Sequence, residues 1–325
     1  MLETLVVIPN WNGRHLLARC LGALAAQTYQ AFAVVIADNG STDGSVEYVS
    51  AHFPDVFVIA NAENRGFAMA TNQGIRALES RYVATLNNDT EVDPVWLASL
   101  IAAMESAPDV GMVASKMLFA DRPQMINSAG IAIDRVGIAW DWRGGEPDDP
   151  DERAPVEIFG PCAGAALYRR AMLDEIGLFD EDFFAYMEDV DLAWRARVAG
   201  WRCLYAPQAR VLHHHSATAK EGSPFKSFHL GRNKVWLLLK NYPFRALWYT
   251  VPLLVLYEVF ALLYALLLRR DLHAWRGRWA GLRRWRAMCR KRPRIQPDAG
   301  RPDIPFLMPV VCPWQVSRRY RHLRQ

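Results

Sequence analysis

Residues 5–12, LVVIPNWN, pass from four apolar side chains directly into a polar turn. A short apolar run rich in β-branched residues that ends in this way predicts a buried strand. The arrangement recurs along the first 115 residues. It predicts further strands at 32–36, 56–59, 82–86 and 110–114, and helices near 14–27, from about 43, near 67–79 and from Pro94. Alternating strands and helices predict an α/β fold whose mostly parallel sheet is covered by helices on both faces.

The composition is that of a globular protein. The chain has 325 residues, of which 51% are hydrophobic and 22% are charged, which excludes a disordered or fibrous protein. The five cysteines include no Cys-x-x-Cys pair, so neither a zinc site nor a disulfide framework is indicated and a reducing compartment is favoured. The N-terminus shows no signal-peptide pattern, and we expect the catalytic part in the cytosol.

Four polar clusters follow predicted strands, at residues 9–12, 38–45, 64–68 and 87–90. Each cluster alone is more often a simple turn or a helix cap. Ligands of parallel α/β sheets bind at the carboxyl ends of the strands, however, so four clusters at such positions favour one shared crevice.

A nucleotide suits this crevice. The sequence has no P-loop motif and no GxGxxG after the first strand, which argues against a P-loop NTPase and a dinucleotide dehydrogenase. Asp38 could accept hydrogen bonds from a base or a ribose. Asp89 could hold a hard cation against a diphosphate, because Mg²⁺ often uses only one or two carboxylates together with substrate phosphates.

A second block, residues 176–195, is rich in acidic and aromatic side chains. A helix that begins near Glu188 would pair Asp191 with Arg195 four residues later and would place acids at its positive end. A structural role for Glu188 and Asp191 is therefore as well supported as a functional one. Asp189 is rotated by about 100° from Glu188 on such a helix. It can therefore point elsewhere, and it is the candidate general base.

Three consecutive histidines, 213–215, follow a short apolar strand predicted at 209–212. Strand alternation puts His213 and His215 on the same face. A lone histidine is usually an ordinary core or surface residue, but with three together metal binding by one of them is an equally good interpretation. The acidic, Gly- and Pro-rich segment 140–157 is instead expected to be a mobile excursion outside the core.

In this order and spacing the pieces resemble glycosyltransferase family 2, the inverting enzymes of the GT-A fold, and in particular its bacterial rhamnosyltransferase-like branch. The resemblance covers residues 4 to about 242 and includes Asn72 and Gly74. It implies a GT-A catalytic domain at 1–235, with a nucleotide-binding half at 1–115 and an acceptor and catalytic half at 116–235. The remainder, 236–325, would be a membrane-associated helical region with a basic tail.

The resemblance implies which residues bind the donor. Asp38 matches the position that recognises the base of a nucleotide-diphosphate sugar, and residues 64–66 match a loop that approaches the nucleotide or its phosphates. Together with Asp38, the positions that it assigns to the nucleotide-sugar site are Pro9, Asn12, Asn64, Arg65, Gly66 and Asn88.

The resemblance also implies a metal and a base. Asp89 matches the last carboxylate of an Asp-x-Asp motif and His213 a histidine that completes a site for Mg²⁺ or Mn²⁺, although Asn87 replaces the motif's first carboxylate and an amide is a weaker cation ligand. Asp189 matches the catalytic base. The candidate acceptor or supporting residues are Glu188 and Tyr186.

The implied reaction is a single displacement that moves a sugar from a nucleotide-diphosphate donor to a lipid-linked or polysaccharide acceptor in cell-surface glycan synthesis. dTDP-rhamnose is one candidate donor. Asp189 would take a proton from the acceptor hydroxyl, and the cation would stabilise the leaving diphosphate.

Residues 247–268 are apolar apart from Glu258 and are long enough to cross a bilayer; a buried core helix is the alternative. The stretch that follows, 269–294, is rich in Arg. A Lys/Arg excess and a nucleotide-sugar substrate both belong on the cytoplasmic side. We therefore expect a re-entrant or interfacial segment on anionic lipid at the cytoplasmic face of the inner membrane, with Trp275, Trp279 and Trp285 at the interface.

Two non-enzymatic alternatives stay open. Asn87 suggests a nucleotide-sugar-binding membrane scaffold without turnover, although the Glu188-Asp189 pair argues against it. The Arg- and Trp-rich stretch 269–294 could instead bind nucleic acid. The adjacent apolar run is not expected of a nucleic-acid module, so no nucleic-acid partner is expected.

Overall fold

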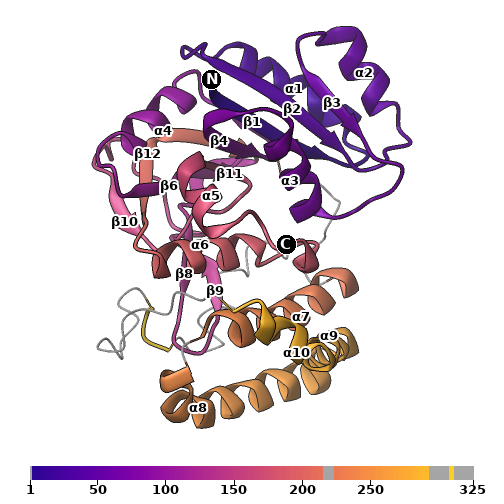
Figure 1. Cartoon of the computed structure of the whole chain (residues 1–325), viewed down its shortest axis with the longest axis vertical. Coiled ribbons are helices and arrows are strands. Elements are labelled where there is room, and N and C mark those ends of the chain that lie inside the picture. Colours follow the sequence, from indigo (N-terminus) through magenta and orange to yellow (C-terminus); the bar gives the residue numbers. More distant parts are fainter. Residues whose placement is uncertain (1, 215–222, 243, 293–306, 311–325) are drawn as a thin grey trace.

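The computed structural model describes residues 2–214, 223–242, 244–292 and 307–310. Within these residues ten strands form one mixed sheet in the order β10-β12-β6-β11-β4-β1-β2-β3, with β5 paired to β12 and β7 to β6 (Figure 1). The strands of this sheet are β1 Leu2–Asn10, β2 Phe32–Asp38, β3 Phe57–Ala60, β4 Ser80–Leu86, β5 Thr90–Val92, β6 Val110–Phe119, β7 Arg122–Ser128, β10 Val156–Ile158, β11 Ala165–Arg169 and β12 Arg202–His213.

The sheet is parallel where the sequence predicts it. Strand β1 pairs in parallel with β2 and with β4, and β2 pairs in parallel with β3. All five predicted strands of the first 115 residues are present. Towards the other edge β11 runs antiparallel between β4 and β6, so the sheet as a whole is mixed. The register places Asn10 beside Asp38, which brings the polar ends of β1 and β2 together.

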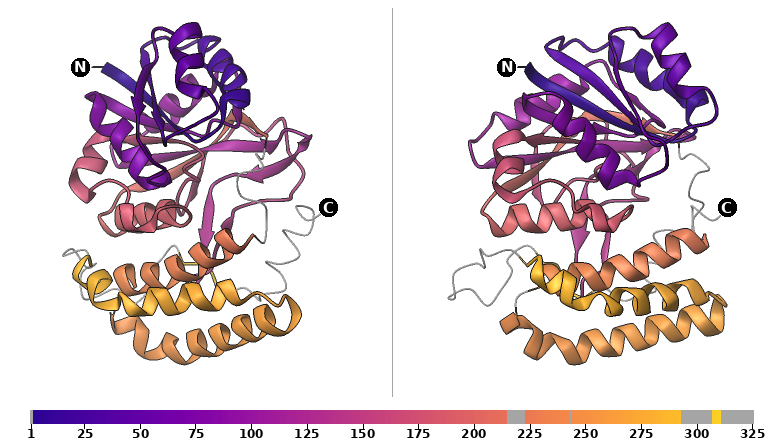
Figure 2. Two further views of the ribbon diagram at one scale, coloured as in Figure 1. Left: turned by 90° about the vertical axis from the view of Figure 1, so that its right-hand side faces the viewer. Right: turned by 45° about the vertical axis from the view of Figure 1, so that its right-hand side comes forward.

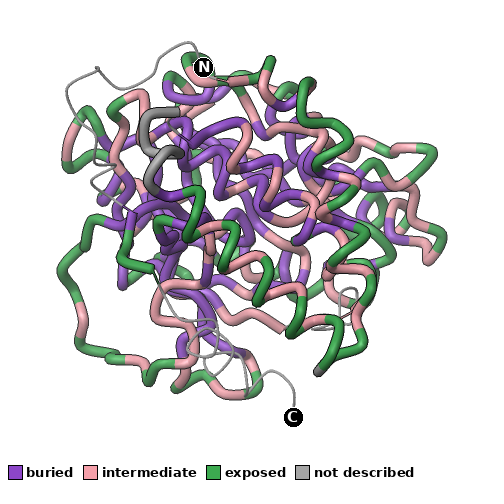
Figure 3. Tube along the Cα trace, turned by 90° about the horizontal axis from the view of Figure 1, so that it is seen from below, coloured by how far each residue is buried: buried purple, intermediate pink, exposed green. Residues whose placement is uncertain are grey.

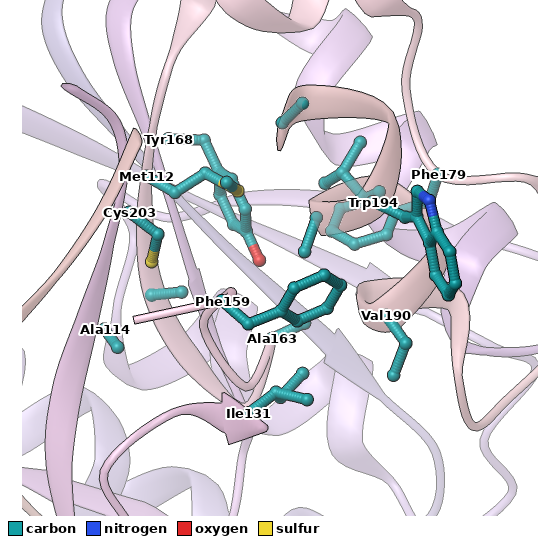
Figure 4. Packing of buried hydrophobic residues seen from close by; sticks show 14 of the residues in the cluster. Met112, Ala114, Ile131, Phe159, Ala163, Tyr168, Phe179, Val190, Trp194 and Cys203 are labelled. Atoms are coloured by element: carbon teal, nitrogen blue, oxygen red, sulfur yellow. The ribbon is translucent and has the colours of Figure 1, made fainter. Parts of the chain in front are cut away.

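Helices cover both faces because β1 buries side chains on both. Leu5 and Val7 contribute to a core with helices α3, α5 and α6, whereas Val6 and Ile8 contribute to a core with α1, α2 and α4. Figure 4 shows part of the first core, where Phe159 and Trp194 pack edge to face, and Figure 3 shows the buried chain between the exposed helices. The bounds are α1 Arg14–Ala25, α2 Ser45–His52, α3 Phe67–Ala77, α4 Trp96–Met104, α5 Arg170–Ile176, the short 3₁₀ helix η1 Glu181–Phe183 and α6 Glu188–Val198.

The structure corrects two sequence-based expectations. Helix α4 begins at Trp96 instead of Pro94. The segment 140–157 is not an excursion outside the core, because Lys116, only 1% exposed, donates to Asp148 Oδ1 and to the Asp149 carbonyl, both at 2.8 Å. A lysine on a buried strand requires a charged partner, and this acidic segment supplies it. The hairpin of β8 Ile131–Ile133 and β9 Ala139–Asp141 leads into the segment.

In the described part of the C-terminal region, four helices lie beneath the α/β domain (Figure 2). They are α7 Pro224–Asn241, α8 Phe244–Leu263 with a π-helical continuation η3 Tyr264–Leu268, α9 Leu272–Arg283 and α10 Trp285–Arg290. Helices α7 and α9 approach closely because glycines line their contact: a Cβ on Gly277 would lie 2.1 Å from the Phe228 carbonyl oxygen. The predicted domain boundary at 235/236 falls inside α7, and the Pro-rich basic tail lies mostly outside the described residues.

Candidate active site

The carboxyl ends of β1, β2 and β4 are joined by hydrogen bonds between short polar side chains. Asn10 Nδ2 donates to Asp38 Oδ2 at 2.7 Å, and Asn88 Nδ2 donates to Asn10 Oδ1 at 2.7 Å. Ser41 donates to both carboxylate oxygens of Asp38, from its amide at 2.8 Å and from its hydroxyl at 2.6 Å. Asp38 is 1% exposed. These bonds fix it as an acceptor at the carboxyl end of β2.

Asn10 is a member of this network that was not predicted from the sequence as a site residue. The signal was present, because Asn10 is the first polar side chain after the apolar run of β1. Its exposed neighbour Asn12 adopts a left-handed backbone (φ 50°) and accepts from the Thr42 amide at 2.8 Å. Pro9 lies half-buried at the end of the same strand. Both predicted nucleotide residues therefore lie beside the Asp38 network.

The loop 64–66 lies against the segment that precedes α6. Asn64 Oδ1 accepts from the Gly66 amide at 2.9 Å, and Arg65 is exposed. Gly66 has φ 86°, and a Cβ there would lie 2.6 Å from both the ring and the carbonyl oxygen of Phe184. The Ala68 amide donates to the same carbonyl at 3.2 Å. Only glycine fits this position, and it brings the predicted phosphate loop to the acidic block.

Asp89 and His213 come together although 124 positions separate them in the chain. His213 Nε2 lies 3.2 Å from Asp89 Oδ1, and both side chains are largely buried. His213 Nδ1 lies 2.8 Å from Asn127 Oδ1. An amide oxygen only accepts, so Nδ1 is the donor in this contact and Nε2 is the ring nitrogen that faces Asp89.

Asp89 and His213 are suitable ligands for a divalent cation, but the two side chains alone do not complete a coordination site. A carboxylate and an oriented imidazole suit Mn²⁺ or Mg²⁺ when phosphate oxygens supply further ligands. Among the described residues no group of three or more His, Cys, Asp or Glu is placed to hold a metal by itself. His214 instead lies 3.4 Å from Glu91, and His215 lies outside the described residues.

Three neighbouring acids at the start of α6 have three different environments. Asp189 accepts from the Ala163 amide at 3.3 Å and from the Val190 amide at 2.8 Å. Burial nevertheless raises the pKa of Asp189 to about 6. Glu188 is 6% exposed, and no hydrogen bond to its Oε2 is present among the described residues. Burial, and secondarily the Asp189 charge, raises the pKa of Glu188 well above its usual range.

Asp191 is structural, as its spacing predicts. It is paired with Arg195 at 2.9 Å, with Lys240 at 2.8 Å and with Asn241 Nδ2 at 2.8 Å. Burial alone would raise its pKa, but the charges of Lys240 and then Arg195 lower the pKa of Asp191 to about 2. Lys240 and Asn241 belong to α7, so the C-terminal helices hold α6 in place.

One short segment links the predicted base to the metal motif. The Ala163 amide donates to Asp189, and the neighbouring Gly164 carbonyl accepts from the Asn87 amide at 2.8 Å. The carboxylate of Asp189 and the motif 87–89 therefore border the same turn before β11. Tyr186 lies two residues before α6, with φ 69° and its carbonyl bonded to Asn233 of α7. The arrangement can accept a proton on one side and bind an anion-bearing group on the other.

The fold matches that of solved GT-A glycosyltransferases. GalNAc-T7 with UDP, GalNAc and Mn²⁺ superposes with a TM-score of 0.60 at 20% identity, over 73% of this chain and 48% of that one. A mannosyltransferase from Pyrobaculum calidifontis in complex with GDP-Man and Mn²⁺ gives 0.52 at 20% identity, over 72% and 62%. This chain thus spans less than two thirds of either structure.

Sequence comparison identifies the family. The sequence model of glycosyl transferase family 2 matches residues 5–177, and the chain belongs to that family. It is 31% identical over 245 residues to the N-acetylglucosaminyl-diphospho-decaprenol L-rhamnosyltransferase of Mycobacterium tuberculosis strain H37Rv, which covers 67% of this chain and 78% of the relative. It is also 28% identical to the pre-mycofactocin glycosyltransferase of the same strain, over 70% of this chain and 46% of the relative.

Proposed function

We propose that this chain is an inverting glycosyltransferase that moves a sugar from a nucleotide-diphosphate donor to a lipid-linked or polysaccharide acceptor, with Asp189 as the general base. The observation that carries the proposal is the shared turn 163–164, which bonds Asp189 on one side and Asn87 of the metal motif on the other. A base with a pKa of about 6 is mostly ionised at neutral pH and is well matched to taking a hydroxyl proton.

The donor side supplies the nucleotide site. Asp38, fixed by Asn10 and Ser41, would recognise the base or ribose, while the loop 64–66 would approach the diphosphate. The named rhamnosyltransferase relative supports a deoxyhexose donor such as dTDP-rhamnose and a lipid-diphosphate acceptor. Inversion requires the acceptor oxygen to attack from the face opposite the diphosphate, the side on which we place Asp189.

Asp89 and His213 would hold the divalent cation, with Asn127 keeping the imidazole in the required tautomer. A bound cation would neutralise the negative charge of the leaving diphosphate. The Mn²⁺ named in both GT-A structures supports this role. Asn87 contributes its backbone amide to the turn 163–164, so the lack of a first carboxylate in the motif does not disrupt the fold of the site.

We further propose that the C-terminal helices lie flat on anionic lipid at the cytoplasmic face of the inner membrane. Residues Thr250–Leu267 form a helix apolar and long enough to cross a bilayer, and only 11% of this window is buried. Its charge, Glu258, instead pairs with Lys234 of α7 and Arg278 of α9. Helix α8 runs alongside α9 in Figure 2, and an in-plane helix explains both facts better than a span.

The exposed apolar surface has the composition of an interfacial layer. Trp275 and Trp279 stack 6.5 Å apart and are 56% and 55% exposed. The other large apolar side chains exposed on α8, η3, α9 and α10 are Val251, Leu253, Val255, Leu256, Val259, Phe260, Leu263, Tyr264, Leu266, Leu267, Leu272, Leu282 and Trp285. Tryptophan beside arginine is typical of helices that lie at the headgroup level. Contact of these helices with the membrane surface would keep the candidate active site near a lipid-linked acceptor.

Thermal stability of the purified chain with UDP, dTDP, GDP or CMP, each with and without Mn²⁺ or Mg²⁺, tests the donor site. A ligand at one hundred times its dissociation constant stabilises a protein by about 2.7 kcal/mol. We expect a metal-dependent shift with one diphosphate and its loss in Asp89→Ala. No shift with any nucleotide would contradict the donor site. Binding without transfer to any lipid-linked acceptor would support the scaffold alternative.

A further inference from the structure

The segment that delivers the predicted base has an unusual backbone. Phe184, Tyr186 and Met187 have φ angles of 64°, 69° and 67°, in the left-handed region that non-glycine residues rarely adopt. Helix α6 begins at the next residue, so this segment sets the direction in which Glu188 and Asp189 leave the backbone. A backbone of this kind persists only where its surroundings hold it.

Two consecutive residues of α7 provide that support. Asn233 Nδ2 lies 2.9 Å from the Phe183 carbonyl oxygen, 2.9 Å from that of Ala185 and 2.7 Å from that of Tyr186. Arg232 Nη2 donates to the Phe183 carbonyl at 2.8 Å. The Asn233 side chain is fully buried, and its own oxygen accepts from Arg232 Nε at 2.9 Å. One amide group thus contacts three backbone carbonyls between residues 183 and 186.

The next residue of α7 faces the other way. Lys234 is paired with Glu258 of α8, which is also paired with Arg278 of α9. The turn therefore lies between the α/β domain and the helices proposed to contact lipid. Phe184 also accepts from the Ala68 amide beside the predicted phosphate loop. A displacement of α7 would therefore reach the base through this turn.

We propose that Asn233 is a positioning residue: its side-chain N–H groups hold the left-handed turn 184–187 so that Asp189 faces the acceptor, and α7 ties this geometry to α8 and α9. The inference rests on the proposed function. Asn233 acts through the backbone carbonyls that its side-chain amide contacts. Among the described residues, the neighbouring Arg232 side chain donates only to the carbonyls of Asp182 and Phe183, which precede the turn.

The test compares Asn233→Asp with Asn233→Ala and with wild type. Aspartate has the same shape but no N–H to donate, so it faces the carbonyls with a repulsive oxygen. We expect both variants to lose about 10²-fold in kcat, as a misplacement of about 1 Å does. The KM for the donor should stay within about twofold, and the acidic limb of the pH–rate profile should shift. If only the packing of the side chain mattered, Asn233→Asp would keep the wild-type kcat, and this result would contradict the proposal.

Gln27→Ala is the matched control. Gln27 is also a buried amide that bridges backbone groups, donating to the Asp93 carbonyl at 2.8 Å and accepting from the Leu97 amide at 3.0 Å. It should lower stability while leaving the pH–rate profile unchanged. An equal shift of the profile in Gln27→Ala would overturn the proposal, because a general loss of stability would then suffice to cause it.

Hydrogen exchange of the amides in 184–191 tests the turn without any transferase assay. Exchange in this segment should accelerate by at least tenfold in Asn233→Asp, with α1 and α4 unchanged. A wild type without transfer activity would refute the proposed function but leave this readout intact. Unaltered exchange together with wild-type kcat would refute the positioning role. Should Asn233→Asp fail to fold, Arg232→Gln removes the bonds to Asp182 and Phe183 and should give the same changes in smaller measure.

Discussion

The donor side and the base side of the candidate site are held by different means. On the donor side, Asn10, Asp38 and Asn88 leave adjacent strands of one sheet and bond to one another directly. On the base side, Asp189 follows a left-handed turn that is held by α7, more than 40 residues later in the chain. Changes in α7 should therefore disturb proton transfer and spare nucleotide binding, whereas changes at the strand ends should do the reverse.

The largest effect is expected where α7 meets α6. Lys240→Met removes a cation that is 4% exposed and paired with both Asp180 and Asp191. Breaking a buried pair leaves a charge uncompensated and costs about 3–5 kcal/mol, measured as the free energy of unfolding in urea. Lys291→Met, which removes a 39% exposed partner of Asp180, is the control and should cost about 0–1 kcal/mol. Equal losses of stability in the two variants would contradict the conclusion that the buried Lys240 holds α6 in place.

Acid should weaken the same contact. The native pKa of Asp191 is about 2 against an ordinary 3.8, so the carboxylate binds fewer protons in the folded state than in the unfolded state. Its contribution is complete above about pH 4 and is lost as the pH falls towards 2. In Lys240→Met this acid-dependent component should shrink. An unchanged slope of stability between pH 4 and pH 2 would contradict the role of Lys240.

The complementary change is on the donor side. Asp38→Ala leaves the donors of Asn10 and Ser41 without their acceptor. An unsatisfied buried donor costs about 1–3 kcal/mol, and the affinity for the matching nucleoside diphosphate should fall with it. Thermal shift with the nucleotide measures this effect. The pH–rate profile of residual transfer should remain that of wild type, and a shift would show that the two sides are not independent.

Contacts between residues close in the chain could be predicted from the sequence, whereas contacts between distant residues could not. The strands of the first 115 residues and their polar ends are local patterns, and the start of α6 and the Asp191–Arg195 pair follow from helical spacing. The hold of Asn233 on the turn 184–187 leaves no local signal, because it depends on the packing of α7 below the sheet. The buried pairing of Lys116 with Asp148 is hidden for the same reason.

Asn127→Ala should have a smaller effect, which is confined to the affinity for the divalent cation. Losing the partner of His213 Nδ1 frees the imidazole to rotate and to change tautomer, and outer partners of metal-bound histidines are worth about 10–100-fold in affinity. The Mn²⁺ concentration needed for nucleotide binding measures it. His214→Ala, next in the chain and directed at Glu91, is the control and should leave that concentration unchanged. Equal effects would argue against His213 as a ligand.

Near neutral pH, the smallest expected effect is that of protonation of the base. Burial raises the pKa of Asp189 to about 6 from an ordinary 3.8. Since the base must be ionised, kcat/KM should rise with pH to a plateau above about 6 and fall about tenfold for each unit below it. A limb near pH 4 would show that Asp189 is either solvated like a surface carboxylate or not the base.

The most direct test of the central claim is a parallel measurement of sugar transfer and donor binding in wild type and Asp189→Asn. The substitution keeps the size of the side chain and removes a carboxylate whose ionisation burial disfavours. One of the two backbone amides that donate to Asp189 loses its acceptor, so the free energy of unfolding is measured alongside. We predict that transfer falls by about 10²–10⁴-fold while donor affinity stays within about twofold. Near-normal transfer by Asp189→Asn would contradict the account.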